Sequence, residues 1–231
     1  MFDNFWQKLY DIIIVDQGYK DILRGLEQTI IIALGALVIG TVLGVITATV
    51  KILPKKGIIN RLLHLIADIY ITVIRGTPIV VQLLIAYFGI LAGKGLNATL
   101  IAVIVFGINS GAYVAEIVRA GILAVDKGQM EAGRSLGLSF GVTMRKIILP
   151  QAIKNIIPAL GNEFVVLIKE TSVAGFITVF DLTRAARALV AEHYEAFVIY
   201  IVLAFVYLVL VMVATSIVNY IEKELRKSDT R

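Results

Sequence analysis

The sequence has no cysteine and few charged residues. Its 231 residues include two His, four Pro and 17% Asp, Glu, Lys and Arg, whereas roughly 25% of a soluble domain is charged. The absence of Cys excludes disulfides, thiolate metal sites and cysteine nucleophiles. His64 and His193 are far apart in the sequence and belong to no metal-ligand cluster. No arrangement of Ser, His and an acid indicates hydrolysis, so the sequence does not support a metal-centred or hydrolytic enzyme.

Apolar residues dominate the composition. They make up 58% of the chain and form runs near or above the ~20 residues with which a helix crosses a bilayer. We predict an all-α polytopic membrane protein, a single transmembrane domain over residues 1–231 without a separate soluble domain. The N-terminal region has several Asp residues and no basic leader, so no cleavable signal peptide is expected. The apolar runs cover residues 26–50, 58–92, 98–123, 152–177 and 196–221.

The Lys and Arg residues alternate between the connections of these runs. The positive-inside rule assigns connections rich in Lys and Arg to the cytoplasm. Fourteen of the 22 such residues lie at 51–61, at 119–154 and in the C-terminal tail. The two remaining connections contain only Lys94, Arg184 and Arg187. The basic connections and the C-terminal tail are therefore predicted to be cytoplasmic.

The run at 58–92 is too long for one straight crossing. As a single helix it would span about 50 Å at 1.5 Å per residue, while each half around Arg75-Gly76-Thr77-Pro78 is short for a crossing. Because the two basic connections share a side and 98–123 crosses once between them, 58–92 must cross an odd number of times. We predict one broken span with Gly76 and Pro78 at the break. Five crossings follow, with the N-terminus outside and the C-terminus in the cytoplasm.

Two further patterns concern the membrane surface and helix packing. Residues 1–20 place aromatic and aliphatic side chains at helical intervals among Asp and Lys, which predicts an interfacial helix on the outer surface. A frayed lead-in to the first span is the alternative. The pairs Gly40/Gly44 and Gly107/Gly111 predict close helix packing within or between subunits.

Residues 126–150 form a polar, glycine-containing segment between two apolar runs. Most connections are far shorter. Asp126 is placed to cap a helix over residues 129–136, and Gly137 suits the left-handed residue with which many helices end. Ser139 is placed to cap a second helix. The sequence therefore predicts two short helices that meet at a glycine.

Such a pair of helices would form a rigid knob able to transmit force to a neighbouring protein. The first helix is expected to expose Gln129, Glu131 and Arg134, and Pro150 to begin the next element. The alternative is a loop on the membrane surface whose Lys and Arg only contact anionic lipid.

The segment resembles the EAA loop of ABC importer permeases, which docks onto the ATP-hydrolysing subunit. The resemblance lies in Glu131-Ala132-Gly133, Gly137 and Ile147-Ile148-Leu149-Pro150. Gly133 stands where the family usually has Ala, so a small residue is kept. The resemblance implies that ATPase coupling involves Gln129, Glu131, Ala132, Gly133, Gly137, Leu149 and Pro150.

Other stretches resemble the polar amino acid importers of the histidine, arginine, glutamine and glutamate type. Together they cover roughly residues 20–222. The stretches are Arg75-Gly76-Thr77-Pro78 with Gln82, Ala115-Glu116-Ile117, Arg119-Ala120-Gly121-Ile122, Gly161-Asn162-Glu163 and Lys169-Glu170-Thr171-Ser172.

The resemblance implies a type I ABC importer fold and a multi-pass permease subunit in the bacterial cell (inner or plasma) membrane. Two permeases, a second copy or a homologue, would pair over two ATPase subunits, and an extracytoplasmic binding protein would deliver a polar amino acid. ATP and Mg are expected on the ATPase subunits and no cofactor on this chain; no nucleic acid partner is expected. The nearest match to a P-loop, residues 89–95, is one residue short between its glycines and lacks Ser or Thr after Lys94.

Polar residues inside the runs are candidates for a substrate pathway, because an ionisable group at bilayer depth costs several kcal/mol unless it is paired or hydrated. Glu163 lies near the middle of its run, and its carboxylate suits an ammonium group. A purely structural hydrogen bond is the alternative for Glu163. An internal salt bridge between Glu116 and Arg119 is the alternative for that pair. The acids favour a cationic substrate such as arginine, lysine or histidine without deciding it. The predicted pathway residues are Arg75, Gln82, Asn109, Glu116, Arg119, Asn162 and Glu163.

Two other classes of protein fit the sequence less well. An ion-coupled secondary transporter or channel commonly shows internal repeats and discontinuous helices, but the two halves of this sequence show no convincing repeat. A membrane enzyme or scaffold is the third class, and the sequence lacks any catalytic constellation for it. The importer permease is therefore the main hypothesis.

Overall fold

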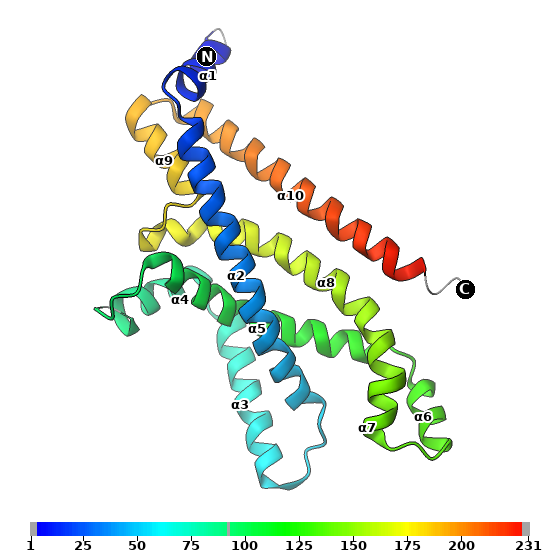
Figure 1. Ribbon diagram of the computed structural model, residues 1–231. Helices are drawn as coiled ribbons and strands as arrows, with labels where there is room; N and C mark the ends of the chain where they lie inside the picture. Colours follow the sequence, from blue (N-terminus) through cyan, green and yellow to red (C-terminus); the bar gives the residue numbers. More distant parts are fainter. Residues whose placement is uncertain (1–3, 92, 228–231) are drawn as a thin grey trace. The chain divides into compact units, whose positions relative to one another are not determined.

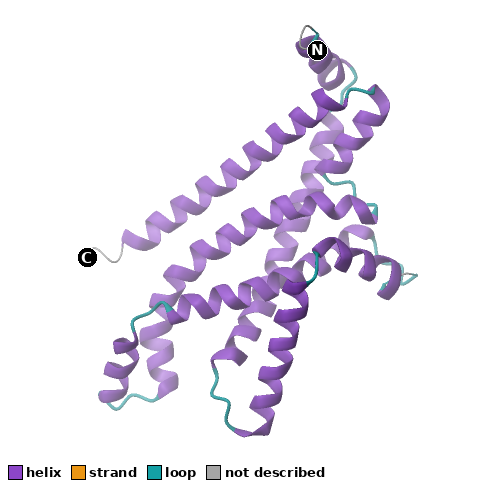
Figure 2. Cartoon of the chain, turned by 180° about the vertical axis from the view of Figure 1, so that it is seen from behind, coloured by secondary structure: helices purple, strands orange, loops and turns teal. Residues whose placement is uncertain are grey.

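Helices make up all the regular structure in the part of the chain that the computed structural model describes, residues 4–91 and 93–227 (Figure 1, Figure 2). The all-α prediction is confirmed for these residues. Among the elements, η1, η2 and η3 are π-helical and η4 is a 3₁₀-helix. In chain order they are α1 (Phe5–Tyr10), η1 (Asp11–Val15), α2 (Tyr19–Ile52), α3 (Gly57–Gly76), α4 (Ile79–Leu84), η2 (Ile85–Ile90), α5 (Ala98–Leu123), α6 (Lys127–Ser135), α7 (Phe140–Thr143), η3 (Met144–Ile148), α8 (Leu149–Glu170), η4 (Thr171–Ile177), α9 (Leu182–His193) and α10 (Ala196–Arg226).

Four helices among the described residues are long and apolar enough to cross a membrane, namely α2, α3, α5 and α10. The remaining predicted run, 152–177, corresponds to α8, which is more polar because it contains residues such as Lys154 and Glu163. The prediction that this run continues to residue 177 as one span is wrong. The α-helix ends at Glu170, and the tighter η4 follows up to a left-handed residue, Thr178.

The break predicted in the run at 58–92 is confirmed. α3 ends at Gly76, Thr77 and Pro78 are extended, and α4 begins at Ile79. The ring of Pro78 disfavours the helical conformation at Thr77, and Pro78 has no N–H group to donate to a helix. The prediction that each half is short for a crossing is wrong for the first half, since α3 alone has 20 residues and is among the helices able to cross.

The helices pack as two units. Four helices, α2, α5, α8 and α10, contribute residues to both, whereas α9 belongs entirely to the first and α6 to the second. The first unit comprises the described residues of Met1–Ala36, Pro78–Phe106 and Val165–Val213. The second comprises those of Leu37–Thr77, Gly107–Phe164 and Ala214–Arg231.

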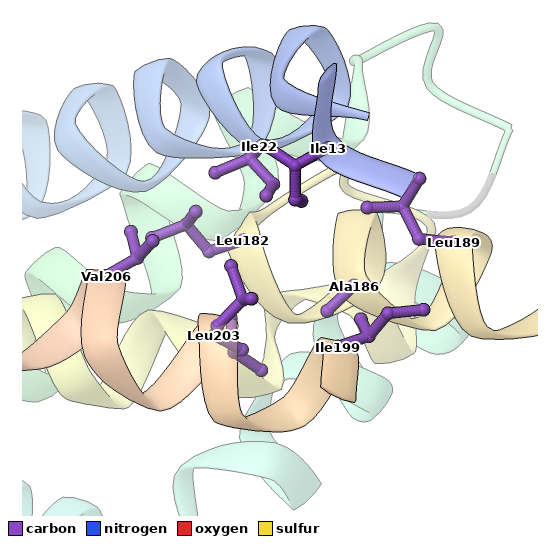
Figure 3. A pocket seen from close by; sticks show the side chains of 9 residues that line it. Ile13, Ile22, Leu182, Ala186, Leu189, Ile199, Leu203 and Val206 are labelled. Carbon is purple, nitrogen blue, oxygen red and sulfur yellow. The ribbon is translucent and has the colours of Figure 1, made fainter. Parts of the chain in front are cut away.

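In the first unit, α9 packs against the first turns of α2 and α10. The main-chain N–H of Leu182 donates to the Thr29 hydroxyl of α2 at 3.3 Å. Apolar side chains from η1, α2, α9 and α10 converge around a void of about 10 Å³ (Figure 3). Thr178 and Tyr194 on either side of α9 are left-handed, with φ of 70° and 57°, a conformation that costs a non-glycine residue roughly 1–2 kcal/mol. The hydrogen bond to Thr29 and the apolar contacts therefore hold α9 in a defined orientation.

The N-terminal segment of the first unit is helical, as predicted. α1 and η1 form, and Lys8 Nζ of α1 lies 2.5 Å from Glu195 Oε1 at the start of α10. Trp6 is 77% exposed, in keeping with the predicted interfacial position, because tryptophan is enriched where apolar and aqueous phases meet.

The second unit has an apolar cluster that joins the membrane helices to the segment at 126–150. α2, α5 and α8 contribute to it, as does η3. The cluster places α6 and α7 beside each other and next to the ends of α5 and α8 (Figure 1, Figure 2). Its buried members are Ala48, Val114, Val118, Val125, Ile148, Ala152 and Ile156.

Candidate functional site

Glycines bring α2 and α5 into close contact in the second unit. A Cβ atom on Gly40 would lie 2.8 Å from the Ser110 side chain, and one on Gly44 would lie 2.5 Å from Val114. A Cβ atom on Gly111 would lie 2.9 Å from Leu43 Cβ. The predicted close packing is confirmed for Gly40, Gly44 and Gly111, and it fixes the position of Ser110.

Ser110 forms a buried polar pair with Glu163. The Ser110 hydroxyl of α5 donates to Glu163 Oε1 of α8 at 2.7 Å, and both residues are buried. Asn109, the neighbour of Ser110 on α5, is also buried. Because a carboxyl group at this depth is costly without a partner, the hydroxyl donor stabilises Glu163 where sequence analysis placed a pathway residue.

The other predicted pathway residues lie elsewhere. The Arg75 guanidinium lies over the Tyr113 ring, 5.0 Å from its centroid, in a cation–π contact. Asn162 is exposed although Glu163, the next residue, is buried. Gln82 is half-buried on α4, in the first unit. Sequence proximity and chemical type therefore did not predict which of these groups meet.

Glu116 and Arg119 form the predicted pair on α5. Arg119 Nη2 donates to Glu116 Oε2 at 2.6 Å. Glu116 lies six positions after Ser110, about 9 Å along the helix axis, so the pair is displaced from Glu163 toward the 126–150 segment. Arg119 also lines a cavity of about 360 Å³, together with Lys51 and Lys127. The structure thus brings Arg119 next to the start of α6.

The 126–150 segment, named the coupling segment below, has the two capped helices that were predicted. Asp126 accepts a hydrogen bond from the Gly128 N–H at 2.7 Å, and Ser139 accepts one from the Val142 N–H at 3.4 Å. α6 begins at Lys127, two residues earlier than predicted. The caps satisfy N–H groups that have no partner within a helix.

Gly137 ends α6 in a Schellman motif. Its φ is +82°, its N–H donates to the Arg134 carbonyl at 3.0 Å, and the Leu138 N–H donates to the Gly133 carbonyl at 3.2 Å. This pair of bonds defines the motif, in which a glycine takes the left-handed position. The Arg134 side chain also donates to the Leu138 carbonyl at 2.9 Å. The turn between α6 and α7 is therefore locally fixed.

Pro150 does not follow a break, although it was expected to begin the next element. The backbone stays helical from Phe140 to Glu170, and α8 begins one residue earlier, at Leu149. A proline cannot donate to the carbonyl four residues before it and clashes with that carbonyl. The wider π-helical turn of η3, immediately before α8, accommodates Pro150 without interrupting the helix.

Comparisons with known proteins identify the family. The family described as the binding-protein-dependent transport system inner membrane component matches residues 40–227. The chain belongs to this family. It is 40% identical over 210 residues to the arginine transport system permease protein ArtQ of Bacillus subtilis (strain 168), covering 90% of this chain and 94% of ArtQ. It is 43% identical over 206 residues to the putative glutamine transport system permease protein GlnP of Rickettsia bellii (strain RML369-C), covering 88% and 92%.

Solved structures agree with this assignment. A crystal structure described as an amino acid ABC transporter with histidines has a TM-score of 0.83 and 41% identity, covering 93% of this permease and 98% of that chain. An inward-facing MetNI methionine ABC transporter has a TM-score of 0.75 at 18% identity, covering 89% and 96%, and shows the shared fold. The chain is thus a multi-pass membrane permease subunit of an ABC transporter.

The permease exposes one face of the coupling segment. Gln129, Glu131 and Ala132 are exposed on α6, whereas Gly133 is buried. Leu149 is half-buried and Pro150 is exposed. The predicted coupling residues therefore include both surface groups and groups that shape the segment from inside.

Three residues of this site were not predicted from the sequence. Leu136 is 80% exposed at the end of α6, which is unusual for a leucine. Its place in the sequence, as an apolar residue directly before Gly137, could have indicated this exposure. Thr143 is fully buried against Gly133. The Tyr70 hydroxyl donates to the Ile108 carbonyl at 2.6 Å. No local pattern predicts the last two contacts, because each joins residues distant in the sequence or on different helices.

Proposed function

We propose that this permease translocates a polar amino acid by alternating access driven by separate ATPase subunits. The coupling segment carries the proposal, since two short capped helices around Gly137 present an exposed surface of charged residues and Leu136. Relatives whose names specify arginine or glutamine transport support an amino acid as the substrate.

The proposed arrangement has five crossings, the N-terminus outside, and the coupling segment and C-terminal tail in the cytoplasm. The distribution of Lys and Arg supports it. In this arrangement the exposed face of α6 meets an ATPase subunit, and the connection that contains α9 lies on the outer side.

The proposed complex contains two permeases, this chain with a second copy or a homologue, and two ATPase subunits that bind ATP and Mg. This chain itself contributes no ATPase site and binds no cofactor. An extracytoplasmic binding protein delivers the substrate, as the family's description supports.

The proposed pathway passes the buried pair of Ser110 and Glu163. The Glu163 carboxylate suits the ammonium group of an amino acid, while Arg75, Gln82 and Asn109 suit its carboxylate. Glu116 and Arg119 pair with each other next to the coupling segment, a position from which they can relay movement of that segment to α5.

Reconstitution tests the proposal. The permease is assembled with its ATPase in proteoliposomes, and uptake of labelled arginine, histidine, glutamine and glutamate is measured with the cognate binding protein and ATP. We expect uptake that requires ATP and the binding protein and that survives dissipation of ion gradients. Uptake that needs an ion gradient but no ATP would instead establish a secondary transporter.

A further inference from the structure

α9 carries two arginine side chains without an ionic partner. Arg184 and Arg187 are three residues apart and share one face of the helix. Among the ion pairs of residues 4–91 and 93–227, none involves either side chain. Asp181 does not neutralise them, because it is fully buried and accepts hydrogen bonds from the Thr183 and Arg184 N–H groups at 3.0 and 3.2 Å. Burial raises the pKa of Asp181, and these hydrogen bonds oppose the rise.

The two arginines line a cavity of about 420 Å³ with Gly175 and Ala188. Gly175 lies close to the start of α9, since a Cβ atom there would lie 3.0 Å from Asp181 Oδ1 and 3.4 Å from Arg184 Cβ. The opposite face of α9 is buried through Leu182, Ala186 and other apolar residues against α2 and α10 (Figure 3). The helix therefore cannot rotate its arginines away from the cavity without losing that apolar contact.

Two effects disfavour cations at this place. Arg184 lies in the first turn of α9, where the helix dipole favours anions. Like charges three residues apart on a helix repel each other. An anion from outside the chain would relieve both effects. The connections assigned to the outer side contain three basic residues, Lys94, Arg184 and Arg187, and the two arginines line this cavity.

We propose that the cavity of Arg184 and Arg187 binds an acidic side chain of the extracytoplasmic binding protein when that protein docks. The proposal rests on the proposed function and its orientation. Guanidinium groups bind carboxylates through two parallel hydrogen bonds. The lining contains no acidic or aromatic side chain for the ammonium group of a free amino acid and no long apolar side chain for a lipid tail. A carboxylate presented by a protein therefore fits the cavity best.

The test uses the complete complex of permeases and ATPases in nanodiscs with the purified cognate binding protein. Affinity is measured over a series of salt concentrations for the wild type, Arg184→Gln/Arg187→Gln and Lys94→Gln. Lys94 is the matched control, because it is an exposed outer cation outside the cavity. We expect the double variant to bind about tenfold more weakly at low salt and to lose part of the salt dependence. Lys94→Gln should bind as the wild type does.

Equal affinity and equal salt dependence of the double variant and the wild type would overturn the proposal. So would a defect seen only in nanodiscs that contain phosphatidylglycerol, since the ligand would then be a lipid headgroup. Gel filtration checks assembly with the ATPase, and if the double variant does not assemble, Arg187→Gln alone decides the question in the same assay. If the wild type itself does not bind the binding protein, the proposed function is refuted. If the double variant binds as the wild type does, only the proposed docking site is refuted.

Discussion

Gly133 packs against Thr143 so closely that no side chain fits between them. A Cβ atom at 133 would lie 2.5 Å from Thr143 Cγ2 and 3.0 Å from its hydroxyl oxygen. Both residues are buried, and Thr143 also donates to the Ser139 carbonyl at 3.0 Å. The motif that this segment resembles usually has Ala at the position of Gly133. In this chain Thr143 occupies the space that a side chain at position 133 would need.

Gly133→Ala is therefore expected to destabilise the coupling segment by about 1–3 kcal/mol, the usual cost of overpacking a tight site. The reconstituted complex should show a lower unfolding temperature and weaker stimulation of ATP hydrolysis by the binding protein. Thr143→Ser removes the methyl group and keeps the hydroxyl, so Gly133→Ala/Thr143→Ser should recover most of both. Gly141→Ala is the control, because its Cβ would meet nothing within 4 Å. If the effects of Gly133→Ala and Thr143→Ser on the unfolding temperature were additive, the direct contact between the two residues would not be the cause of the destabilisation.

Glu163→Gln is expected to reduce transport and leave assembly intact. The amide keeps an oxygen that can accept from Ser110 but removes the charge for a substrate ammonium group. Loss of one charge-assisted hydrogen bond predicts a decrease of about tenfold in uptake by proteoliposomes. Glu222→Gln, which changes an acid paired with Arg226 on α10, should not affect uptake. Unchanged uptake by Glu163→Gln would exclude a pathway role for this carboxylate.

At the scale of elements, α6 and α7 behave as one rigid piece. Side-chain caps close the starts of both helices, and the Schellman motif at Gly137 closes the end of α6. The piece packs on η3, which continues directly into α8. In the proposed mechanism, this packing would pass a movement of the exposed face of α6 to the helix that carries Glu163.

Gly137→Val is expected to uncouple ATP hydrolysis from transport. A β-branched residue at φ +82° costs roughly 1–2 kcal/mol of backbone strain, which the turn can relieve only by moving α6 relative to α7. The ratio of ATP hydrolysed to amino acid transported should increase, while the complex still assembles. Gly137→Asn should change this ratio much less, since asparagine tolerates the left-handed conformation. Normal coupling in Gly137→Val would show that the turn geometry is dispensable.

At the scale of the whole molecule, the topology depends on whether α8 crosses the membrane. Within residues 4–91 and 93–227, four helices meet the length and hydropathy expected of a crossing, and α8 meets the length alone. Its Glu163 has a hydroxyl donor from α5, which reduces the cost of inserting a polar helix. Five crossings are thus consistent with the chemistry of α8.

The absence of cysteine makes this topology directly testable. Single substitutions Lys55→Cys and Lys94→Cys introduce one thiol each, and cells are labelled with a membrane-impermeant maleimide. We expect labelling at 94 in intact cells and labelling at 55 only after permeabilisation. Leu83→Cys, at a fully buried position, should not be labelled in either case. The reverse pattern at 55 and 94 would invert the proposed orientation.

Local patterns predicted part of the candidate site well. The caps at Asp126 and Ser139, the left-handed Gly137 and the break at Pro78 depend on residues within a few positions of each other. Such interactions do not need the rest of the fold. The pairing of Ser110 with Glu163 joins residues 53 positions apart, so only the packing of α5 against α8 could reveal it.

The sequence by itself determined the all-helical membrane character, the family and the two-helix form of the coupling segment, because apolar run length, short-range capping and motif spacing are properties of consecutive residues. Only the tertiary structure decided which polar groups meet. It placed Arg119 beside the coupling segment, buried Thr143 against Gly133, and fixed α9 so that Arg184 and Arg187 line one cavity. These contacts depend on how helices distant in sequence interlock, and the small residues that permit such close approach acquire partners only when the chain is packed.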